Sequence, residues 1–394
     1  MVIRSQYLEK LHKTRDSQII KVITGVRRCG KSTLLMQFQE ELRKSGVQSG
    51  QIVAVNFEDL AFKSLLDYEA LYEYLLEHLQ PGKMTYVFLD EIQNVPQFQK
   101  AVDSLYIKPN VDVYLTGSNA SLLSGELATL LSGRYIEISM LPLSFAEYHE
   151  LMGGDRRDDW NAYFRKGGFP FAATLEDDEV WRDYLLGIYH TVLLKDIVGR
   201  KGITDVSVLE SVTSFLFDNI GSIVSSKKIA DSLTSNGRKT TSITVENYIA
   251  ALSESFLLYK AGRYDIKGKQ HLKSLEKYYL VDLSLRRILL GDSVSDLGHM
   301  LENIVYLELI RRGYRVTIGK VGEQEIDFVA VKGSDRRYIQ VAASVLDPAT
   351  FKREIAPLKA IKDNYPKTIL TLDELPMEFE GIRQVNLLDY LLQG

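Results

Sequence analysis

One eight-residue run limits the possible folds more than any other part of the chain. Residues 25–32 read GVRRCGKS and match G-x-x-x-x-G-K-[S/T] at every fixed position. A short apolar segment, 18–24, precedes the run, and a segment with helical spacing follows it. In this order of strand, turn and helix, backbone N–H groups and a helix N-terminus surround a phosphate group. We therefore expect a phosphate-binding loop, and a chance match in an ordinary strand–turn–helix is the alternative.

Each residue type in this loop has its own chemical task. Glycines let the backbone turn so that its N–H groups face the anion. The Lys31 ammonium reaches the β- and γ-phosphates, and the Ser32 hydroxyl is a ligand for Mg²⁺. The expected cofactors are therefore ATP and Mg²⁺. We expect at least one of Arg27 and Arg28 to face phosphate or a partner, and Cys29 to fill a variable loop position.

An acidic pair follows a second apolar strand. Residues 86–91 read YVFLDE, so Asp90 and Glu91 come where a buried strand ends. In ATPases with such a loop, the first carboxylate holds Mg²⁺ and the second polarises the attacking water. Two solvated acids at a strand end are the alternative. The loop upstream favours the catalytic interpretation.

Two further places carry candidate catalytic groups. Ser118 and Asn119 follow the strand expected at 111–115, where a polar side chain can lie between the water and the γ-phosphate. A turn or a helix N-cap explains the same two residues equally well. Arg134 precedes the strand expected at 135–139 and can stabilise transition-state charge in its own or a neighbouring subunit. A surface arginine is the alternative there.

The spacing of apolar segments predicts the fold of the N-terminal part. Strands are expected at 18–24, 51–57, 85–89, 111–115 and 135–139, with helical segments between them. This alternation predicts a parallel sheet with helices on both faces. Each candidate motif except that of Arg134 comes after a strand, where ligands bind in open α/β sheets.

The order of motifs resembles a known family. GVRRCGKS, YVFLDEIQNV, YLTGSNASLL and LSGRYIEISMLPLSFAEY are similar to segments of prokaryotic AAA-like ATPases with a C-terminal domain of uncharacterised function, which are related to archaeal ATPases at the STAND/AAA border. The resemblance covers nearly the whole chain. It implies that Ser118 or Asn119 is the first sensor and that Arg134 is the family's arginine. The expected nucleotide-binding set is Gly25, Arg28, Cys29, Gly30, Lys31, Ser32 and Thr33. The resemblance also implies a winged-helix module and a restriction-endonuclease-like domain.

Composition limits the class and the compartment. The 394 residues suggest domains at 1–155, 156–290 and 291–394, with breaks at the glycine- and aspartate-rich stretches. Cys29 is the single cysteine, which excludes an internal disulfide and fits a reducing cytoplasm. The N-terminus lacks the apolar core of a signal peptide, and no apolar run approaches the ~20 residues of a membrane span. We expect a cytoplasmic protein without a membrane partner.

A basic segment lies inside this acidic chain. Residues 221–280 contain 10 Lys and Arg against 5 Asp and Glu, although the net charge of the whole chain is −4. Helical spacing at 206–219, 227–233 and 241–254, followed by strand-like runs, predicts a winged helix within 206–282. Such a module binds DNA through its last helix and through wing lysines, which here are Lys267, Lys269 and Lys273. A lid or protein-contact module is equally consistent with the pattern.

The C-terminal part resembles a nuclease core that has lost key groups. Glu302 on an expected helix, Asp327 on a strand and Gln340 on the next strand follow the order of PD-(D/E)xK nucleases, which hold a metal ion and its water. The lysine position is Ala342, and the second carboxylate position is Gln340. We expect a degenerate site that binds a partner or nucleic acid without cleaving it. Surface acids on an ordinary α/β domain are the alternative.

Two functional hypotheses follow. In the first, the chain hydrolyses ATP with Mg²⁺ and couples the nucleotide state to the binding of DNA or an unknown protein partner. In the second, it is a nucleotide-gated switch with negligible turnover that acts as a protein-interaction module. Glu91 favours the first. If Arg134 acts in a neighbouring subunit, the working form is a homo-oligomer.

Overall fold

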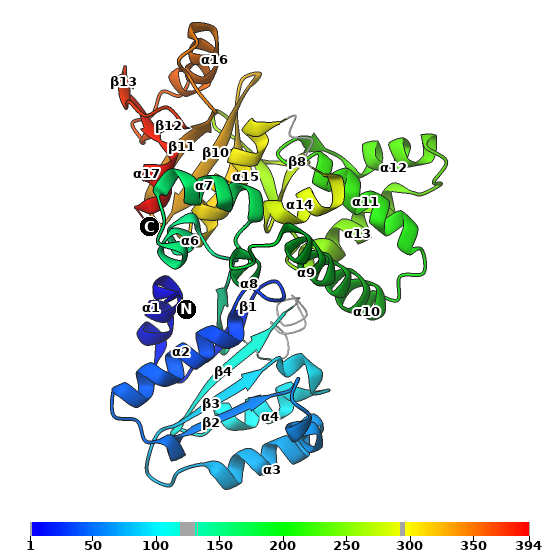
Figure 1. Cartoon of the computed structure of the whole chain (residues 1–394), viewed down its shortest axis with the longest axis vertical. Helices are drawn as coiled ribbons and strands as arrows, with labels where there is room; N and C mark the ends of the chain where they lie inside the picture. Colours follow the sequence, from blue (N-terminus) through cyan, green and yellow to red (C-terminus); the bar gives the residue numbers. More distant parts are fainter. Residues whose placement is uncertain (1, 119–130, 132, 292–295, 394) are drawn as a thin grey trace. The chain divides into compact units, whose positions relative to one another are not determined.

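The computed structural model describes residues 2–118, 131, 133–291 and 296–393 (Figure 1). Contacts divide the chain into two compact units, Met1–Pro142 with Glu254–Phe256 and Leu143–Ser253 with Leu257–Gly394. The division into domains 1–155, 156–290 and 291–394 stays a prediction. No helix in the described part of the chain is long and apolar enough to cross a lipid bilayer.

The first unit is built around a parallel five-stranded sheet in the order β2-β3-β4-β1-β5. Its strands are β1 (Ile20–Thr24), β2 (Ile52–Asn56), β3 (Thr85–Asp90), β4 (Val111–Gly117) and β5 (Tyr135–Ser139). Its described helices include α1 (Ser5–Thr14), α2 (Lys31–Lys44), α3 (Tyr68–His78) and α4 (Phe98–Tyr106). The parallel α/β fold expected for the N-terminal part is therefore confirmed, with each strand close to its expected range.

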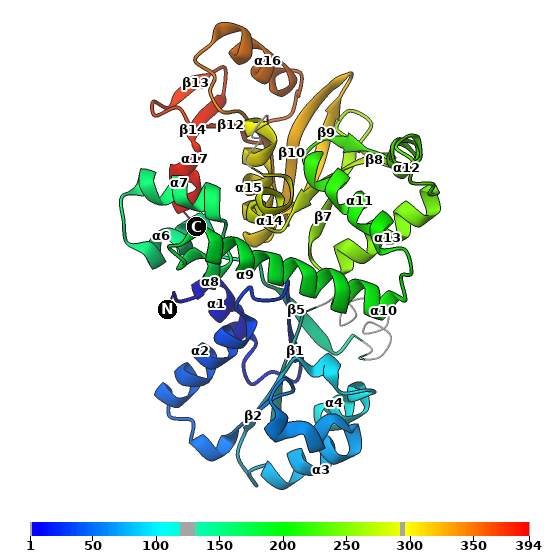
Figure 2. The ribbon, with the colours of Figure 1, turned by 45° about the vertical axis from the view of Figure 1, so that its right-hand side comes forward.

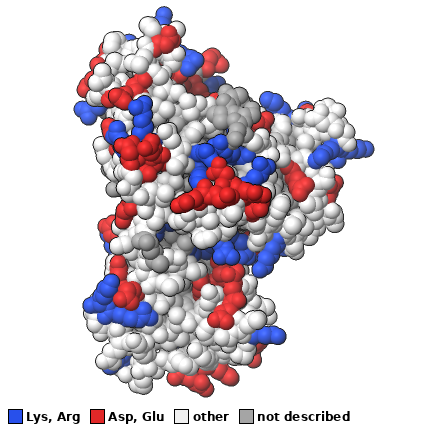
Figure 3. All heavy atoms as spheres, in the orientation of Figure 1, with Lys and Arg blue, Asp and Glu red and all other residues white. Residues whose placement is uncertain are grey.

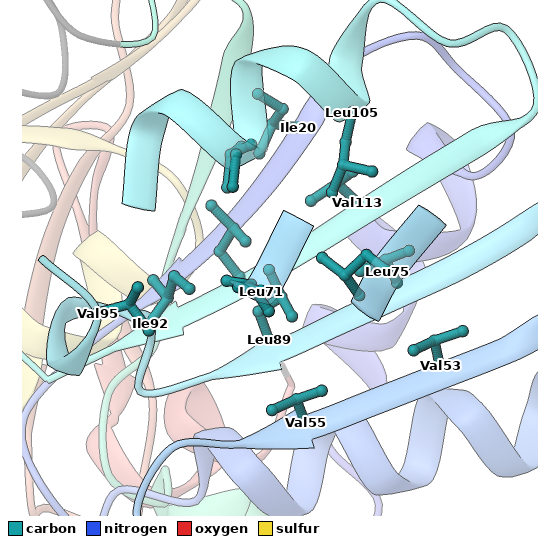
Figure 4. Close-up of a cluster of buried hydrophobic side chains, with 14 of the residues drawn as sticks. Ile20, Val53, Val55, Leu71, Leu75, Leu89, Ile92, Val95, Leu105 and Val113 are labelled. Carbon is teal, nitrogen blue, oxygen red and sulfur yellow. The ribbon is translucent and has the colours of Figure 1, made fainter. Parts of the chain in front are cut away.

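Both faces of this sheet are covered by helices, as Figures 1 and 2 show. Alternate side chains of a strand point to opposite faces. Leu89 and its aliphatic neighbours pack against Leu71 and Leu75 of α3 and against α4 (Figure 4). On the other face, the Phe38 ring of α2 lies 5.2 Å from that of Tyr114. Burial on both sides explains why the strands are nearly continuous apolar runs.

A buried ion pair crosses the sheet near the strand starts. The Lys21 ammonium donates to a carboxylate oxygen of Asp112, and both side chains are at most 1% exposed. The second oxygen of Asp112 accepts a hydrogen bond from the Tyr114 hydroxyl at 2.7 Å and one from the backbone N–H of Asp16 at 2.9 Å. Burial lowers the pKa of Lys21 and raises that of Asp112 although each group opposes the other's shift. The two charges therefore depend on each other.

The second unit begins with a run of helices. They are α6 (Phe145–Met152), α7 (Arg156–Lys166), α8 (Pro170–Ala173), α9 (Asp178–His190), a π-helical segment (Thr191–Val198), α10 (Gly199–Lys201) and α11 (Val206–Asp218). The basic segment then contains β6 (Ile223–Val224), α12 (Ser226–Ser235), α13 (Ser242–Glu254), β7 (Leu258–Asp265) and β8 (Gln270–Leu280). The three helices α11, α12 and α13 and the two strands that follow them were expected from the sequence, whereas β6 was not.

A nine-stranded sheet joins the basic segment to the C-terminal part, in the order β13-β14-β12-β11-β10-β9-β7-β8-β6. The remaining elements are α14 (Leu283–Leu290), α15 (Leu297–Arg311), β9 (Arg315–Val321), β10 (Gln324–Lys332), β11 (Asp335–Val341), α16 (Pro348–Lys359), β12 (Lys367–Thr371), β13 (Met377–Phe379), β14 (Ile382–Asn386) and α17 (Leu387–Leu392).

The parallel pairing of β7 with β9 crosses the domain boundary expected at residue 290. Gly319 of β9 lies in a crowded place in this sheet, because an added Cβ would lie 3.0 Å or less from the side chains of Ile266, Ile326 and Val329. A larger residue there would have to push its neighbours apart. The sheet thus runs across residue 290, through a pairing that joins residues more than 50 positions apart.

We predict that the buried pair is essential for the stability of the first unit. Asp112→Asn leaves the Lys21 charge buried without its counterion, which costs about 3–5 kcal/mol of unfolding free energy. Lys21→Met with Asp112→Leu removes both charges and should cost less than Asp112→Asn alone. Urea denaturation followed by circular dichroism measures both changes.

Glu9→Gln is the control, because the Glu9–Lys13 pair is exposed and should leave unfolding unchanged. Equal stability of Asp112→Asn and the parent would show that the pair does not stabilise this unit.

Candidate functional site

The loop between β1 and α2 has the backbone that its sequence predicts. Gly30 has φ +105° at the N-cap of α2, and Gly25 has φ +148°. A Cβ on Gly25 would lie 2.2 Å from the carbonyl oxygen of Met140, so the loop approaches the backbone after β5 more closely than any side chain allows. Arg28 also has positive φ, at 66°. This bend turns the chain into α2, whose N-terminal amides form an anion-binding end.

A buried arginine holds the loop from behind. Arg4 is 3% exposed and donates to the carbonyl oxygens of Cys29 at 3.1 Å and Leu141 at 2.8 Å. The hydroxyl of Tyr7 accepts a hydrogen bond from the Leu141 backbone N–H at 3.1 Å. The start of α1 therefore fixes the loop against the segment after β5. Arg4 and Tyr7 lie at least 18 positions before the motif in the sequence, so no local pattern indicates this role.

Lys31 lies in the centre of the loop and next to the acidic pair. Its ammonium donates to the carbonyl oxygens of Gly25 at 3.1 Å and Val26 at 3.3 Å. It lies 3.5 Å from a carboxylate oxygen of Glu91, and its side chain is 4% exposed. Two motifs separated by about sixty residues thus meet in one place, as the sequence predicts.

A threonine between the two acids organises them. The Thr116 hydroxyl at the end of β4 donates to a carboxylate oxygen of Asp90. The same hydroxyl accepts the backbone N–H of Glu91 at 2.9 Å. Glu91 has a left-handed backbone, with φ 54°. Thr116 thus fixes both the direction of the Asp90 carboxylate and the turn that carries Glu91. The sequence named this strand end but not this residue, because its role depends on β4 lying beside β3.

Glu91 is surrounded by groups that stabilise its charge. Burial favours the neutral form, but the Lys31 ammonium, a hydrogen bond from Gln93 and nearby Arg27 outweigh it and lower the pKa of Glu91. The Gln93 amide nitrogen lies 2.5 Å from Glu91 and 3.5 Å from the Ser118 hydroxyl. Ser118 is buried, and its side chain forms a hydrogen bond with this carboxylate. Asn119, the other expected sensor, lies outside the described residues.

Asp90 and Ser32 form a donor set that suits Mg²⁺. Burial raises the pKa of Asp90, opposed by hydrogen bonds from the Thr116 and Ser32 side chains. Mg²⁺ in nucleotide sites takes one or two protein oxygens together with phosphate and water oxygens. Ser32 and Asp90 lie in contact and supply a hydroxyl and a carboxylate, so they would hold the ion. Among the described residues, no group of three or more His, Cys, Asp or Glu side chains could hold a metal ion by itself.

The remaining loop residues differ in exposure. Arg27 is partly buried and lies 3.2 Å from Glu58, while Arg28 is exposed. Cys29 is buried, and burial raises the pKa of its thiol, which disfavours the reactive thiolate. Thr33 is partly buried in the first turn of α2. Arg28 is therefore the loop arginine that is more accessible to a ligand or a partner.

Arg134 lies at the other end of the strands. It precedes β5, and its carbonyl accepts the N–H of Ile20, the first residue of β1. The phosphate loop begins only after the five residues of β1, about 16 Å further along the sheet. The Arg134 guanidinium lies 3.4 Å from Asp103 and 5.1 Å from the centre of the Tyr106 ring. Arg134 therefore lies too far from the loop to contact the phosphates of its own subunit.

The basic segment exposes fewer charges than its composition indicates. Lys277 is buried, and Lys260 pairs with Glu276 at 2.6 Å. Figure 3 shows Lys and Arg side chains at the outer edge of the region that carries α12 in Figure 1. The exposed basic residues are Lys227, Lys228, Arg238, Lys239, Lys260, Lys267 and Lys269. The side chain of Lys273, the third expected wing lysine, lies outside the described residues.

The residues of the nuclease-like pattern meet at one cavity of about 590 Å³. Glu302 of α15, Asp327 of β10 and Gln340 of β11 line it together with Ala342. Lys277 of β8 reaches the same cluster, 3.2 Å from Glu302. The sequence did not indicate this lysine, because it comes from the basic segment and from a strand that is not adjacent to β10.

Comparisons with known proteins agree with the α/β fold described for the first unit. Residues 17–149 match a family model described as an AAA domain, and 157–296 match a domain of unknown function, DUF8612. A Walker-type ATPase of Pyrococcus abyssi has a similar fold, with a TM-score of 0.50 at 17% identity over 73% of this chain and 96% of that one.

Two curated relatives extend the similarity to nearly the whole chain. An uncharacterised protein of Haemophilus influenzae is 41% identical over 100% of this chain and 99% of its own length. An uncharacterised protein of Methanocaldococcus jannaschii is 30% identical over 87% of this chain and 79% of its own length. The chain therefore belongs to one family with these two uncharacterised proteins, and its residues 17–149 are the part that matches an AAA domain.

Proposed function

We propose that the first unit binds Mg·ATP and hydrolyses it. One observation carries this proposal: Lys31, Glu91 and the Asp90–Ser32 pair come from two separate motifs and lie within contact of one another. The match to an AAA domain supports the same function. A phosphate-binding loop without an adjacent acid would favour binding alone.

The side chains would divide the reaction among them. The loop amides and Lys31 bind and neutralise the phosphates, and Asp90 with Ser32 would hold Mg²⁺, which supplies charge neutralisation at the phosphate oxygens. Glu91 orients and polarises the attacking water, for which its lowered pKa keeps it ionised at neutral pH. Ser118 and Gln93 hold the Glu91 carboxylate in place. Asn119 stays a candidate first sensor.

We propose that Arg134 acts on the nucleotide of a neighbouring subunit. Its position at the opposite end of β1 from the loop supports action in trans, and its partly exposed guanidinium is accessible to another chain. An arginine that enters a neighbouring site stabilises charge in the transition state. Anchoring of α4 through Asp103 and Tyr106 is the alternative role. A homo-oligomer is therefore part of the proposal.

We further propose that the second unit contains a winged helix over 206–282 that binds DNA and that ATP turnover controls this binding. The order of α11, β6, α12, α13, β7 and β8 supports the winged helix. The exposed lysines near α12 and in the β7–β8 connection support a contact with phosphates. A protein partner that binds the same module is the alternative.

Glu91→Gln should retain ATP binding and lose steady-state phosphate release by at least about a hundredfold, because the amide cannot polarise water. Lys31→Ala should abolish binding, while Met36→Ala on the exposed side of α2 should behave like the parent. Fluorescent-nucleotide titration and a phosphate-release assay, with and without DNA, separate the two steps. A parent that releases phosphate no faster than Glu91→Gln would identify a nucleotide-gated switch instead.

Mixing two inactive variants tests Arg134. We expect Arg134→Ala and Lys31→Ala each to be inactive, because one lacks the arginine and the other lacks nucleotide. In an equimolar mixture, an intact arginine of one chain can face an intact loop of the other, so phosphate release should return to roughly a quarter to a half of the parent rate. Asp103→Ala controls for the anchoring role and should remain active. A mixture without activity would exclude a shared site.

Salt dependence tests the DNA contact. Lys239, Lys267 and Lys269 changed together to Gln should weaken duplex binding and lower the slope of log affinity against log salt by up to about 3, at roughly 0.9 per phosphate contact. Lys352→Gln with Lys362→Gln changes exposed lysines outside the module and should leave the slope unchanged. Fluorescence anisotropy between 50 and 200 mM salt measures both. No binding of the parent at low salt, with or without ATP, would assign the module to protein contact.

A further inference from the structure

The cavity in the second unit is lined by more carboxylates than the single ammonium of Lys277 can neutralise. Its lining includes carboxylates from α15, β10 and α16 and comprises Asp296, Glu302, Glu325, Asp327 and Glu354. Glu354 is paired with Arg353 at 2.8 Å, and Asp296 lies 2.6 Å from a ring nitrogen of His299. This leaves the carboxylates of Glu302, Glu325 and Asp327, whose negative charge requires a cation in the cavity wall.

The ammonium of Lys277 lies between two of these acids, Glu302 and Glu325. It is 3.2 Å from Glu302 and 2.7 Å from Glu325, and its side chain is 4% exposed. The Tyr279 hydroxyl donates to the same oxygen of Glu302 at 3.2 Å. Burial by itself lowers the pKa of Lys277, but the charges of Glu302, Asp327 and Glu325 outweigh it and raise the pKa above its ordinary value. Two carboxylates within 3.2 Å therefore hold the ammonium in this position.

Two further polar side chains at this cavity, those of Gln340 and Asp327, are engaged with protein partners. Gln340 accepts the Asp327 backbone N–H at 3.1 Å through its oxygen and donates to Glu354 at 3.0 Å through its nitrogen. One oxygen of Asp327 accepts the N–H of Val341 at 2.8 Å. Ala342 offers no polar side chain. The donor set therefore does not fit a divalent ion such as a nuclease-like fold would carry, because an ammonium stands between two of the candidate ligands.

We propose that Lys277 takes the place of a metal ion in this cavity. Its ammonium supplies the positive charge that would otherwise come from a bound divalent cation, and it joins β8 of the basic segment to α15 and β10 by ionic contacts. The lysine is part of the chain, so its charge occupies this position whatever the concentration of free metal ions. The second unit consequently has a nuclease-like arrangement of acids that neither binds Mg²⁺ nor cleaves DNA. This proposal is independent of ATP hydrolysis by the first unit.

The proposal predicts that removing the lysine creates a metal site. Without the ammonium, Glu302 and Glu325 would still lie on either side of one point, with Asp327 nearby, and carboxylate oxygens are the ligands that hard divalent cations prefer. Manganese binding to the full chain, measured by electron paramagnetic resonance of free Mn²⁺, tests this. All proteins would carry Asp90→Asn, so that the ATPase site contributes little.

We expect the background protein and Lys277→Arg, which keeps the positive charge, to show no binding attributable to this cavity. Lys277→Ala should bind one Mn²⁺ at least tenfold more tightly than the background, and the further changes Glu302→Gln and Glu325→Gln should abolish the gain. Binding by the background protein that Glu302→Gln removes would overturn the proposal. So would a folded Lys277→Ala variant without the gain.

Folding of the variant gives a second readout. The buried acids of Lys277→Ala lose their counterion, so its melting temperature should fall below that of the background protein and rise again with Mn²⁺, whereas the background should not respond. If Lys277→Ala is unfolded without metal, Mn²⁺ should restore its circular dichroism spectrum. A variant that stays unfolded with Mn²⁺ would overturn the proposal. Metal-dependent plasmid nicking by the parent chain, lost in Asp327→Ala, would overturn it as well.

Discussion

The candidate ATPase site depends on the position of β4 between β1 and β3. All strands of this sheet are parallel, so their carboxyl ends share one edge. β1 brings the phosphate loop to that edge, and β3 brings Asp90 and Glu91. The intervening strand leaves the width of one strand between them and places its own terminal hydroxyl, that of Thr116, in hydrogen-bond contact with both acids. Side-chain geometry at the site is thus a consequence of strand order.

Buried charges are paired differently at the two ends of the parallel strands. Near the strand starts, Lys21 and Asp112 neutralise each other and have no remaining capacity for a ligand. At the strand ends, Lys31 lies 3.5 Å from Glu91, and carbonyl groups with no net charge hold its ammonium. The first arrangement stabilises the fold. The second leaves charges able to interact with phosphate, metal and water, as expected for a site that stabilises developing charge.

Sequence patterns predicted what is encoded locally. Residues 25–32 contain the glycines that the loop backbone requires, and a strand that ends in Asp90 and Glu91 is visible as an apolar run followed by acids. Apolar periodicity also located the helices α11, α12 and α13. These features depend on neighbouring residues in the chain, so a single sequence is sufficient to find them.

Long-range packing determined what the sequence did not reveal. Thr116 acquires its role only because β4 pairs with β3, and Arg4 acquires its role only because α1 starts against the loop. Arg134 was correctly located before a strand. The sequence alone does not show that this strand start lies at the end of the sheet opposite the phosphate loop. The β7–β9 pairing was likewise missed, since no local signal indicates which strands become neighbours.

Lys277 shows how a sequence motif can misrepresent a site that packing completes. The pattern on β11 places Ala342 where a nuclease has its lysine, which by itself indicates only a missing group. The structure supplies a lysine from β8, yet this lysine contacts Glu302 and Glu325 and lies in the position of a counterion. On our proposal, residue types that make a hydrolytic site in a nuclease make a structural ion cluster here, because the distances place the lysine against two carboxylates.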